Sequence, residues 1–315
     1  MEAFVRCWDG RKCTLPSALE WEFAYGLGSP CDGFAMTCIW EPGLERVMAD
    51  AVRFWAVHGN QCVFTGIVDE YRCVRDEKGN RLEISGRGLQ GLLLDNEALP
   101  MEYQIASLQD ILQNHVYPYG IEVVGGENLT SRGGFAVSAG QSEWSVLNDF
   151  VRSGSDRIPY FDRVGRLILS GWEDKKAFEI GNKTVVTKLV YGESRYGVLS
   201  QVVVHDRKTG VSHTVCDEDW IRRGGNCRRV MTVGERDGTD LRKTGEYQLR
   251  LSRGERVTCE VTVAGLFCAF PGELVIIERD NFGGNGRYRV AEAVSGVGAK
   301  GGYTELLLRE TDLLI

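Results

Sequence analysis

Short stretches in which apolar and polar residues alternate recur along most of this chain, and glycine-rich turns separate them. Alternation with a period of two is the mark of a β-strand that buries one face. It is clearest in residues 19–25 and returns in residues 51–57 and 256–263. Residues 62–85 form a long hairpin around a turn at 76–80. The 39 glycines suit hairpins and tight turns, so the sequence predicts a mainly β fold.

Two helices and a hairpin interrupt the strand pattern in the middle of the chain. Ser107 can cap a helix that has Asp110 in the capping-box position. A second helix begins at Ser142 and ends at Gly154. Residues 158–169 then form a hairpin with a glycine in its turn. Together these elements predict a small α+β module.

Bulk charge and hydropathy exclude several classes of protein. The formal net charge of −7 argues against a protein that binds the phosphate backbone of nucleic acids. No apolar run approaches the length needed to cross a bilayer, and the first residues lack the layout of a signal peptide. We therefore expect no membrane insertion, no specific nucleic-acid binding and assembly in the cytoplasm.

The ten cysteines are scattered and contain no C-x-x-C pair. Several lie inside apolar strand patterns, as Cys259 does, where a thiol acts as a small hydrophobic group. We expect reduced, structural thiols and no bound metal.

Two glycine motifs resemble nucleotide-binding loops. Residues 86–91 match G-x-G-x-x-G between a strand and a helix, but that strand belongs to an antiparallel hairpin and no parallel β-α-β unit follows. Residues 296–301 match it again and lead into another strand. We interpret the first as a tight turn from strand to helix and the second as a hairpin tip, so no cofactor is predicted.

Catalytic motifs are missing as well. The four histidines form no metal-binding pair, and no G-x-S-x-G turn is present. Counting acidic residues does not rule out a carboxylate pair of the glycosidase type. Trp40, Trp172 and Trp220 have the chemistry to stack on sugars, although packing is the more common role of such residues. We expect that the protein is not an enzyme.

Residues 206–256 are richer in charge than their surroundings. They contain the cluster Arg222, Arg223, Arg228 and Arg229. The cluster is either a solvated surface or a docking surface, and the nearby acids Asp217, Glu218, Asp219, Glu235 and Asp237 nearly balance it.

The order of the segments resembles phage baseplate hub proteins of the late-control-D and Mu types, which also occur in phage-tail-like bacteriocins. The segments that carry the resemblance are residues 63–70, 82–98, 103–111, 118–121, 140–147, 271–275, 286–290 and 304–308. They span nearly the whole chain in the right order.

The resemblance implies two β-barrels like those of the tail-tube subunit. It places the first barrel in residues 1–98 and the second in residues 186–206 and 256–315. Residues 99–185 would be an α+β peripheral domain and residues 207–255 a charged inserted excursion or domain.

It also implies a structural role in a virion or tail-like particle. Three chains would form a ring of six barrels that joins a hexameric tail tube to a trimeric spike or tail tip. Other baseplate proteins and the tape measure are further expected partners. An envelope-degrading or glycan-binding tail-tip module is the alternative.

Overall fold

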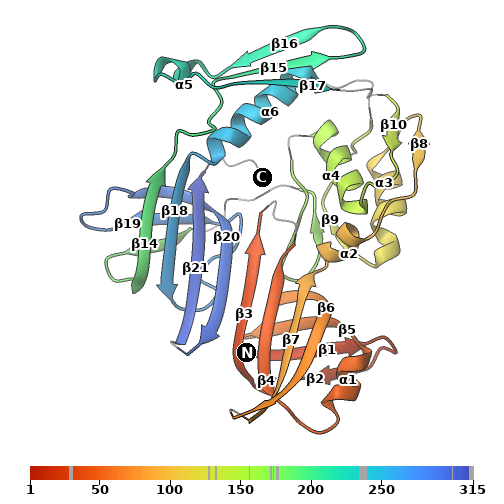
Figure 1. The fold of residues 1–315 in the computed structure, drawn as a ribbon, viewed down its shortest axis with the longest axis vertical. Coiled ribbons are helices and arrows are strands. Elements are labelled where there is room, and N and C mark those ends of the chain that lie inside the picture. Colours follow the sequence, from red (N-terminus) through yellow and green to blue (C-terminus); the bar gives the residue numbers. More distant parts are fainter. Residues whose placement is uncertain are drawn as a thin grey trace.

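The computed structural model describes all residues except 28–30, 78, 127, 132, 156, 171, 173, 175–176, 234–239, 300 and 312–315. The chain is mainly β, with a small α+β module that lies beside a large sheet, which confirms the predicted fold class (Figure 1). No helix within the described residues combines the length and the apolar character needed to span a bilayer.

The N-terminal β domain is an antiparallel sheet with the order β2-β1-β5-β6-β7-β4-β3. Its elements are β1 (Glu2–Cys7), β2 (Lys12–Thr14), β3 (Ala18–Gly26), β4 (Gly33–Ile39), α1 (Leu44–Asp50), β5 (Ala51–His58), β6 (Gln61–Asp76) and β7 (Gly79–Gly88). Strands β6 and β7 form the long hairpin that the sequence predicts, with Asp76 opposite Gly79 at its end.

This sheet curls around a core of aromatic rings. Phe23 of β3 lies 5.2 Å from Phe64 of β6 and 6.2 Å from Phe54 of β5, measured between ring centroids. Phe34 of β4 stacks on Phe54 at 3.9 Å. In each of these ring contacts, the two strands are not neighbours in the sheet. The contacts therefore show that the sheet curls around a shared interior.

The second β domain is formed by segments on both sides of an insertion. Its strands are β13 (Phe178–Gly181), β14 (Val186–Glu193), β18 (Val257–Ala264), β19 (Leu274–Glu278), β20 (Gly286–Gly298) and β21 (Gly301–Glu310). The order is β14-β18-β21-β20, and β19 joins the first half of β20 while β13 pairs in parallel with β19. Buried residues of this domain and of the N-terminal domain form one hydrophobic cluster.

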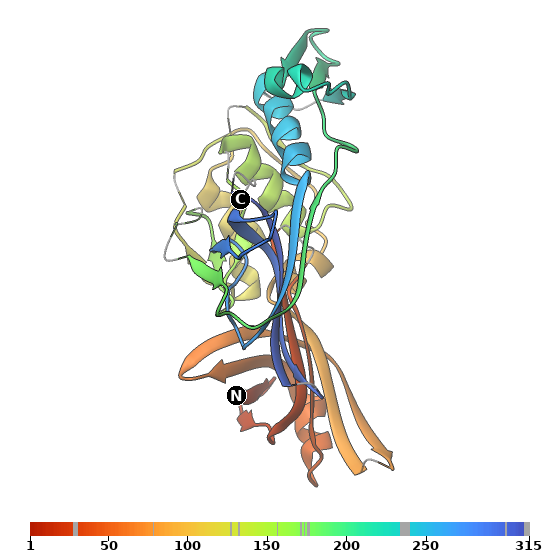
Figure 2. The ribbon, with the colours of Figure 1, turned by 90° about the vertical axis from the view of Figure 1, so that its left-hand side faces the viewer.

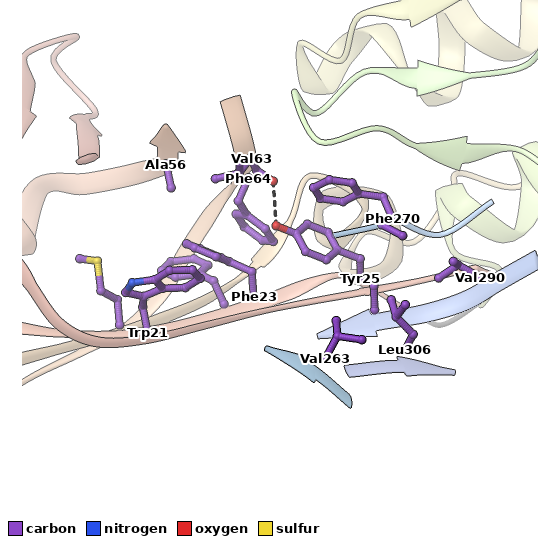
Figure 3. Packing of buried hydrophobic residues seen from close by; sticks show 14 of the residues in the cluster. Trp21, Phe23, Tyr25, Ala56, Val63, Phe64, Val263, Phe270, Val290 and Leu306 are labelled. Carbon is purple, nitrogen blue, oxygen red and sulfur yellow. Dashed lines mark hydrogen bonds between the residues drawn. The ribbon is translucent and has the colours of Figure 1, made fainter. Parts of the chain in front are cut away.

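The two β domains share one sheet because β20 pairs with β3. The paired segments run from Glu292 opposite Gly26 to Val297 opposite Trp21. Side chains reinforce this junction, since Trp21 stacks on Phe267 at 5.3 Å and Tyr25 meets the edge of Phe270 at 5.2 Å. Figure 3 shows Tyr25 between Phe64 and Phe270, with its hydroxyl donating to the Val63 carbonyl at 2.8 Å.

The α+β module is built around a second core. Its elements are α2 (Gln90–Asp95), β8 (Met101–Tyr103), α3 (Leu108–His115), the 3-10 turn η1 (Tyr117–Tyr119), β9 (Val123–Val124), β10 (Phe135–Val137), α4 (Glu143–Gly154), β11 (Tyr160–Phe161) and β12 (Leu167–Ile168). The Ser107–Asp110 capping box and the Ser142 cap are both present. Gly165 has a φ of 82° in the β11–β12 turn, as the sequence predicts for a hairpin glycine.

A separate small module extends from the second β domain (Figure 2). It comprises β15 (Gln201–Asp206), β16 (Ser212–Cys216), α5 (Glu218–Arg222), β17 (Arg228–Val233) and α6 (Leu241–Gly254). The strands form their own sheet, in the order β16-β15-β17, and α6 covers one face around Val202, Val204 and Leu249. The segment expected to be a charged excursion or inserted domain is a folded unit with its own core.

Two strands lie outside the units to which the sequence assigned them. The segment 201–206 was placed in the second barrel, but β15 pairs only with β16 and β17. Conversely, β13 was placed in the α+β domain, and it pairs with β19 of the second β domain. Alternation shows that a segment is a strand but does not identify its partner, which explains both errors.

The glycines of the first G-x-G-x-x-G motif serve strand packing. A Cβ on Gly86 would lie 1.9 Å from the Ile67 carbonyl oxygen, and one on Gly66 would lie 2.1 Å from that of Arg87. The motif's strand β7 runs between the antiparallel neighbours β4 and β6. The close approach of two strands therefore requires glycine here. In the second motif, Gly298 pairs with Gly301 at the β20–β21 hairpin end, and Lys300 lies outside the described residues.

We predict that Phe23→Ala destabilises both β domains together. The ring is fully buried and touches aromatic residues of both domains, including Phe267. Its loss should cost roughly 3–5 kcal/mol. Urea unfolding followed by tryptophan fluorescence and by circular dichroism should show one earlier transition. Leu19→Ala, at an exposed position of the same strand, is the control and should cost under about 1 kcal/mol. Two separated transitions in Phe23→Ala would contradict a shared core.

Candidate assembly surfaces

The continuous sheet presents one open face that crosses both β domains. Cross-strand register places Tyr303, Gly296, Glu22, Ala35, Ser85 and Glu70 in one row along β21, β20, β3, β4, β7 and β6. A second row joins Glu20, Thr37, Glu83 and Arg72. Side chains on these rows point away from the aromatic core, because their neighbours in each strand are the buried ones.

Part of this open face carries an excess of carboxylates. Its glutamates are Glu20, Glu22, Glu70, Glu83, Glu260, Glu292 and Glu305. Its cations include Lys188, Arg72, Arg81, Arg87 and Arg309, and the face continues with Arg53, Arg6 and Lys12 on β5, β1 and β2. Lys188 pairs with Glu260 at 2.6 Å and Arg72 with Glu70 at 2.7 Å. The remaining glutamates make no ion pair with a described residue, so the part of the face formed by β18, β21, β20, β3, β4 and β7 is negatively charged.

The four arginines of the predicted cluster do not share one surface. Arg222 pairs with Asp219 at the end of α5. Arg228 donates to Gln201 at 2.6 Å, and Arg229 donates to Gln248 of α6 at 2.8 Å. Only Arg223 lines a cleft.

Of the acids expected to balance this cluster, Glu235 and Asp237 lie outside the described residues. Asp217 caps α5 by accepting from the Trp220 N–H at 2.9 Å. The sequence therefore located charged positions without showing which of them share a surface.

A cleft of 430 Å³ lies where the α+β module meets both β domains. The β11–β12 hairpin supplies Tyr160, Asp162 and Arg163, and Arg163 lies over the Phe270 ring at 4.0 Å. Trp172 stacks on Tyr160 at 3.7 Å and also packs against Gly272. The cleft is thus built by segments that are distant in the sequence.

Asp32 lines this cleft from the N-terminal domain. It accepts a hydrogen bond from the Gly26 N–H at 3.0 Å, and the Gln90 side chain also donates to it. Burial raises the pKa of Asp32 to about 6, because the desolvated carboxylate has no cation paired with it among the described residues. The sequence offered no sign of this group.

A buried polar network inside the α+β module imitates a catalytic arrangement. His115 Nδ1 lies 2.6 Å from Glu143 Oε2, and its Nε2 lies 3.1 Å from the Tyr103 hydroxyl. Tyr119 donates to Glu143 at 3.0 Å. Because His115 and Glu143 are both almost fully buried, the network links α3 to α4 rather than facing a substrate.

Within the described parts of the chain, no group of three or more His, Cys, Asp or Glu side chains is placed to hold a metal ion. All ten cysteine side chains are free thiols. Burial raises the pKa of Cys31 to about 12 and that of Cys259 to about 11, so these thiols stay protonated and unreactive at neutral pH.

Comparison with known proteins gives matches by structure. No family model matches the sequence, and no curated protein sequence does. The tail protein of Neisseria meningitidis MC58 is 19% identical over 99% of this chain and 97% of that chain, with a TM-score of 0.79. The 43 kDa tail protein of prophage MuSo2 from Shewanella oneidensis is 15% identical over 100% of both chains, with a TM-score of 0.81.

A component of the type VI secretion system of E. coli, which is structurally similar to the T4 bacteriophage tail proteins gp27 and gp5, also matches. It is 10% identical over 93% of this chain and 73% of that chain, with a TM-score of 0.58. At such identities the likeness establishes the fold. The chain has the fold of phage and prophage tail proteins, which confirms the resemblance seen in the sequence.

We predict that Asp32→Asn becomes progressively more stable than the native protein as the pH rises. The pKa of Asp32 in the folded protein, about 6, exceeds its ordinary value of 3.8. Its contribution to stability is therefore full below pH 4 and is lost as the pH rises through 6. The difference in unfolding free energy between variant and native protein should grow by roughly 2–3 kcal/mol between pH 4 and 7.5.

Urea unfolding at several pH values measures this difference. Glu102→Gln, which removes an exposed carboxylate, serves as the control and should show a much smaller change. A difference for Asp32→Asn that stays constant with pH would show that its carboxyl group titrates normally.

Proposed function

We propose that this chain, which has the fold of phage tail proteins, is a structural baseplate hub subunit. Three copies form a ring that joins a hexameric tail tube to a trimeric spike or tail tip. Other baseplate proteins and the tape measure are neighbours of this ring. The subunit is made and assembled in the cytoplasm of the host bacterium and ends in a virion or tail-like particle.

The observation that carries the proposal is the fusion of two β domains into one sheet by the β3–β20 pairing. One chain thereby supplies two side-by-side β units in a fixed orientation. In the described residues, β14 at one end of this sheet and β2 at the other each pair with a single strand. A head-to-tail arrangement of three copies would place six β units around an axis, and this number matches a hexameric tube.

The open, glutamate-rich face supports a place on the central channel. DNA passing through a ring meets whichever face lines it, and a basic lining would retain phosphates by releasing their counterions. A surface with unpaired glutamates such as Glu20, Glu83 and Glu292 repels DNA instead. We therefore assign this face to the channel of the proposed ring.

An envelope-degrading or glycan-binding module is the second candidate. The 430 Å³ cleft between the α+β module and the two β domains favours it in one respect, because carboxylates and the Tyr160–Trp172 pair line the same space. The Trp172 ring, however, already packs against Tyr160 and Gly272, which leaves less of its surface for a sugar. The structural role is therefore the better supported of the two.

We predict that purified protein releases no soluble fragments from peptidoglycan. Asp32 has a raised pKa, but the other acids that line its cleft are already engaged: Asp162 with Arg166, Asp174 with Arg289, and Glu273 with the Phe270 N–H. Reducing-end release is the measurement, with lysozyme as the positive control. Release by the native protein that Asp32→Asn abolishes would replace the structural proposal with an enzymatic one.

We predict three copies per ring when the chain assembles with its tube and spike partners. Two β units per chain fit a six-fold tube only in that number. Native mass spectrometry of the co-expressed complex gives the copy number, and electron microscopy of the particle gives the symmetry and the channel lining. Six copies per ring, or a channel dominated by arginine and lysine, would contradict the proposal. The mass of the isolated chain, measured in the same way, shows whether copies associate without the tube and spike partners.

A further inference from the structure

A second cleft, of 360 Å³, lies where the small module meets the second β domain. Four arginines line it: Arg223 after α5, Arg253 at the end of α6, Arg256 before β18 and Arg287 in β20. The carboxylates that line it are Asp217, Asp219 and Glu310. The described lining therefore holds more cationic than anionic side chains, in a protein whose overall charge is −7.

The carboxylates of the cleft are already engaged. Asp217 pairs with Arg253 at 2.6 Å, and Asp219 pairs with Arg222, which is outside the lining. Glu310 pairs with the Arg256 Nη2 at 2.6 Å. No lining carboxylate is thus left to neutralise the other arginine donors.

Two of the arginines keep accessible hydrogen-bond donors that no close partner among the described residues uses. Arg223 forms no side-chain hydrogen bond or ion pair with any described residue. Arg287 has only Asp174 nearby, at 4.0 Å, and that carboxylate accepts from Arg289 at 2.9 Å. Arg256 Nε, by contrast, is enclosed by protein atoms and has no partner among the described residues, so the exposed guanidinium groups of Arg223 and Arg287 are the ones open to a ligand.

The position of Arg256 is fixed before any ligand arrives. Its guanidinium lies 5.6 Å from the centre of the Trp220 ring and is held on the other side by Glu310. Gly225 in turn packs against Trp220, so closely that a Cβ there would lie 2.3 Å from the ring. An arginine held in this way loses little entropy when it binds an anion.

We infer that this cleft is a binding site for one carboxylate group of another polypeptide. A carboxylate is attracted by Arg223 and Arg287, the two lining arginines without a close ion-pair partner among the described residues. The planar guanidinium groups suit a planar carboxylate, which can accept two parallel hydrogen bonds. This inference does not depend on the copy number of the proposed ring.

The surroundings of the cleft indicate a protein rather than a free small molecule. The segments that form it also expose apolar side chains: Tyr196 is 96% exposed, Ile221 40% and Leu251 38%. Arginine and aromatic residues together are enriched where proteins bind each other. The partner segment would therefore carry an aspartate or glutamate next to apolar residues.

The test is the binding of a fluorescein-labelled, capped peptide, Glu-Leu-Glu-Leu, to the full chain, followed by fluorescence anisotropy. We expect saturable binding that Arg223→Gln weakens by roughly ten- to hundredfold, as for the loss of a charged hydrogen bond. Arg228→Gln is the matched control, because it makes the same charge change in the same module at a residue outside the lining. Peptide binding by Arg256→Gln is compared with that of the native protein only if the two proteins have the same midpoint of thermal unfolding.

Competition separates the kinds of anion. Acetate should displace the peptide at lower concentration than phosphate at equal ionic strength, and a capped Lys-Leu-Lys-Leu peptide should not bind. Equal weakening by Arg223→Gln and Arg228→Gln would reduce the effect to overall charge and overturn the site. No peptide binding, or displacement by phosphate in preference to acetate, would overturn it as well.

Discussion

The pairing of β3 with β20 is the interaction on which the rest of this structure depends. Without it, β3 and β20 would each expose a long row of unpaired backbone groups at a sheet edge. With it, the two β domains share one sheet and one aromatic core, in which Trp21 and Phe23 of one domain meet Phe267 of the other. The domains are fixed in relation to each other by backbone geometry, not by a flexible linker.

Much of this architecture could be predicted from the sequence because its signals are local. Strand alternation, the capping box at Ser107 and the hairpin glycine at Gly165 each depend on residues a few positions apart, and all three are present. The choice of strand partner depends instead on contacts between distant segments. For this reason β15, an alternating strand, was assigned to the wrong sheet, and the parallel pairing of β13 with β19 across almost 100 residues was not foreseen.

The candidate sites show the same contrast between local sequence signals and contacts of distant segments. The sequence identified Arg223 as a possible docking residue, but its arginine neighbours in the chain point elsewhere, and its neighbours in the cleft are Arg253, Arg256 and Arg287. Asp32 is unremarkable in the sequence, since its unusual environment comes from the burial of the cleft it lines. Composition likewise gave no hint that His115 and Glu143, 28 positions apart, share a buried hydrogen bond.

Charge is segregated in this protein, and the segregation links fold to assembly. The open face of the continuous sheet gathers unpaired glutamates, while the cleft beside the small module gathers arginines with free donors. The net charge of −7 is a sum over both surfaces, so it does not reveal where the acidic and basic residues lie. Because the small module is inserted between β14 and β18, at the far end of the sheet from β2, its cationic cleft is displaced from the acidic central strands. An insertion placed there adds a surface for acidic partners while the glutamates of the sheet remain free to face a channel.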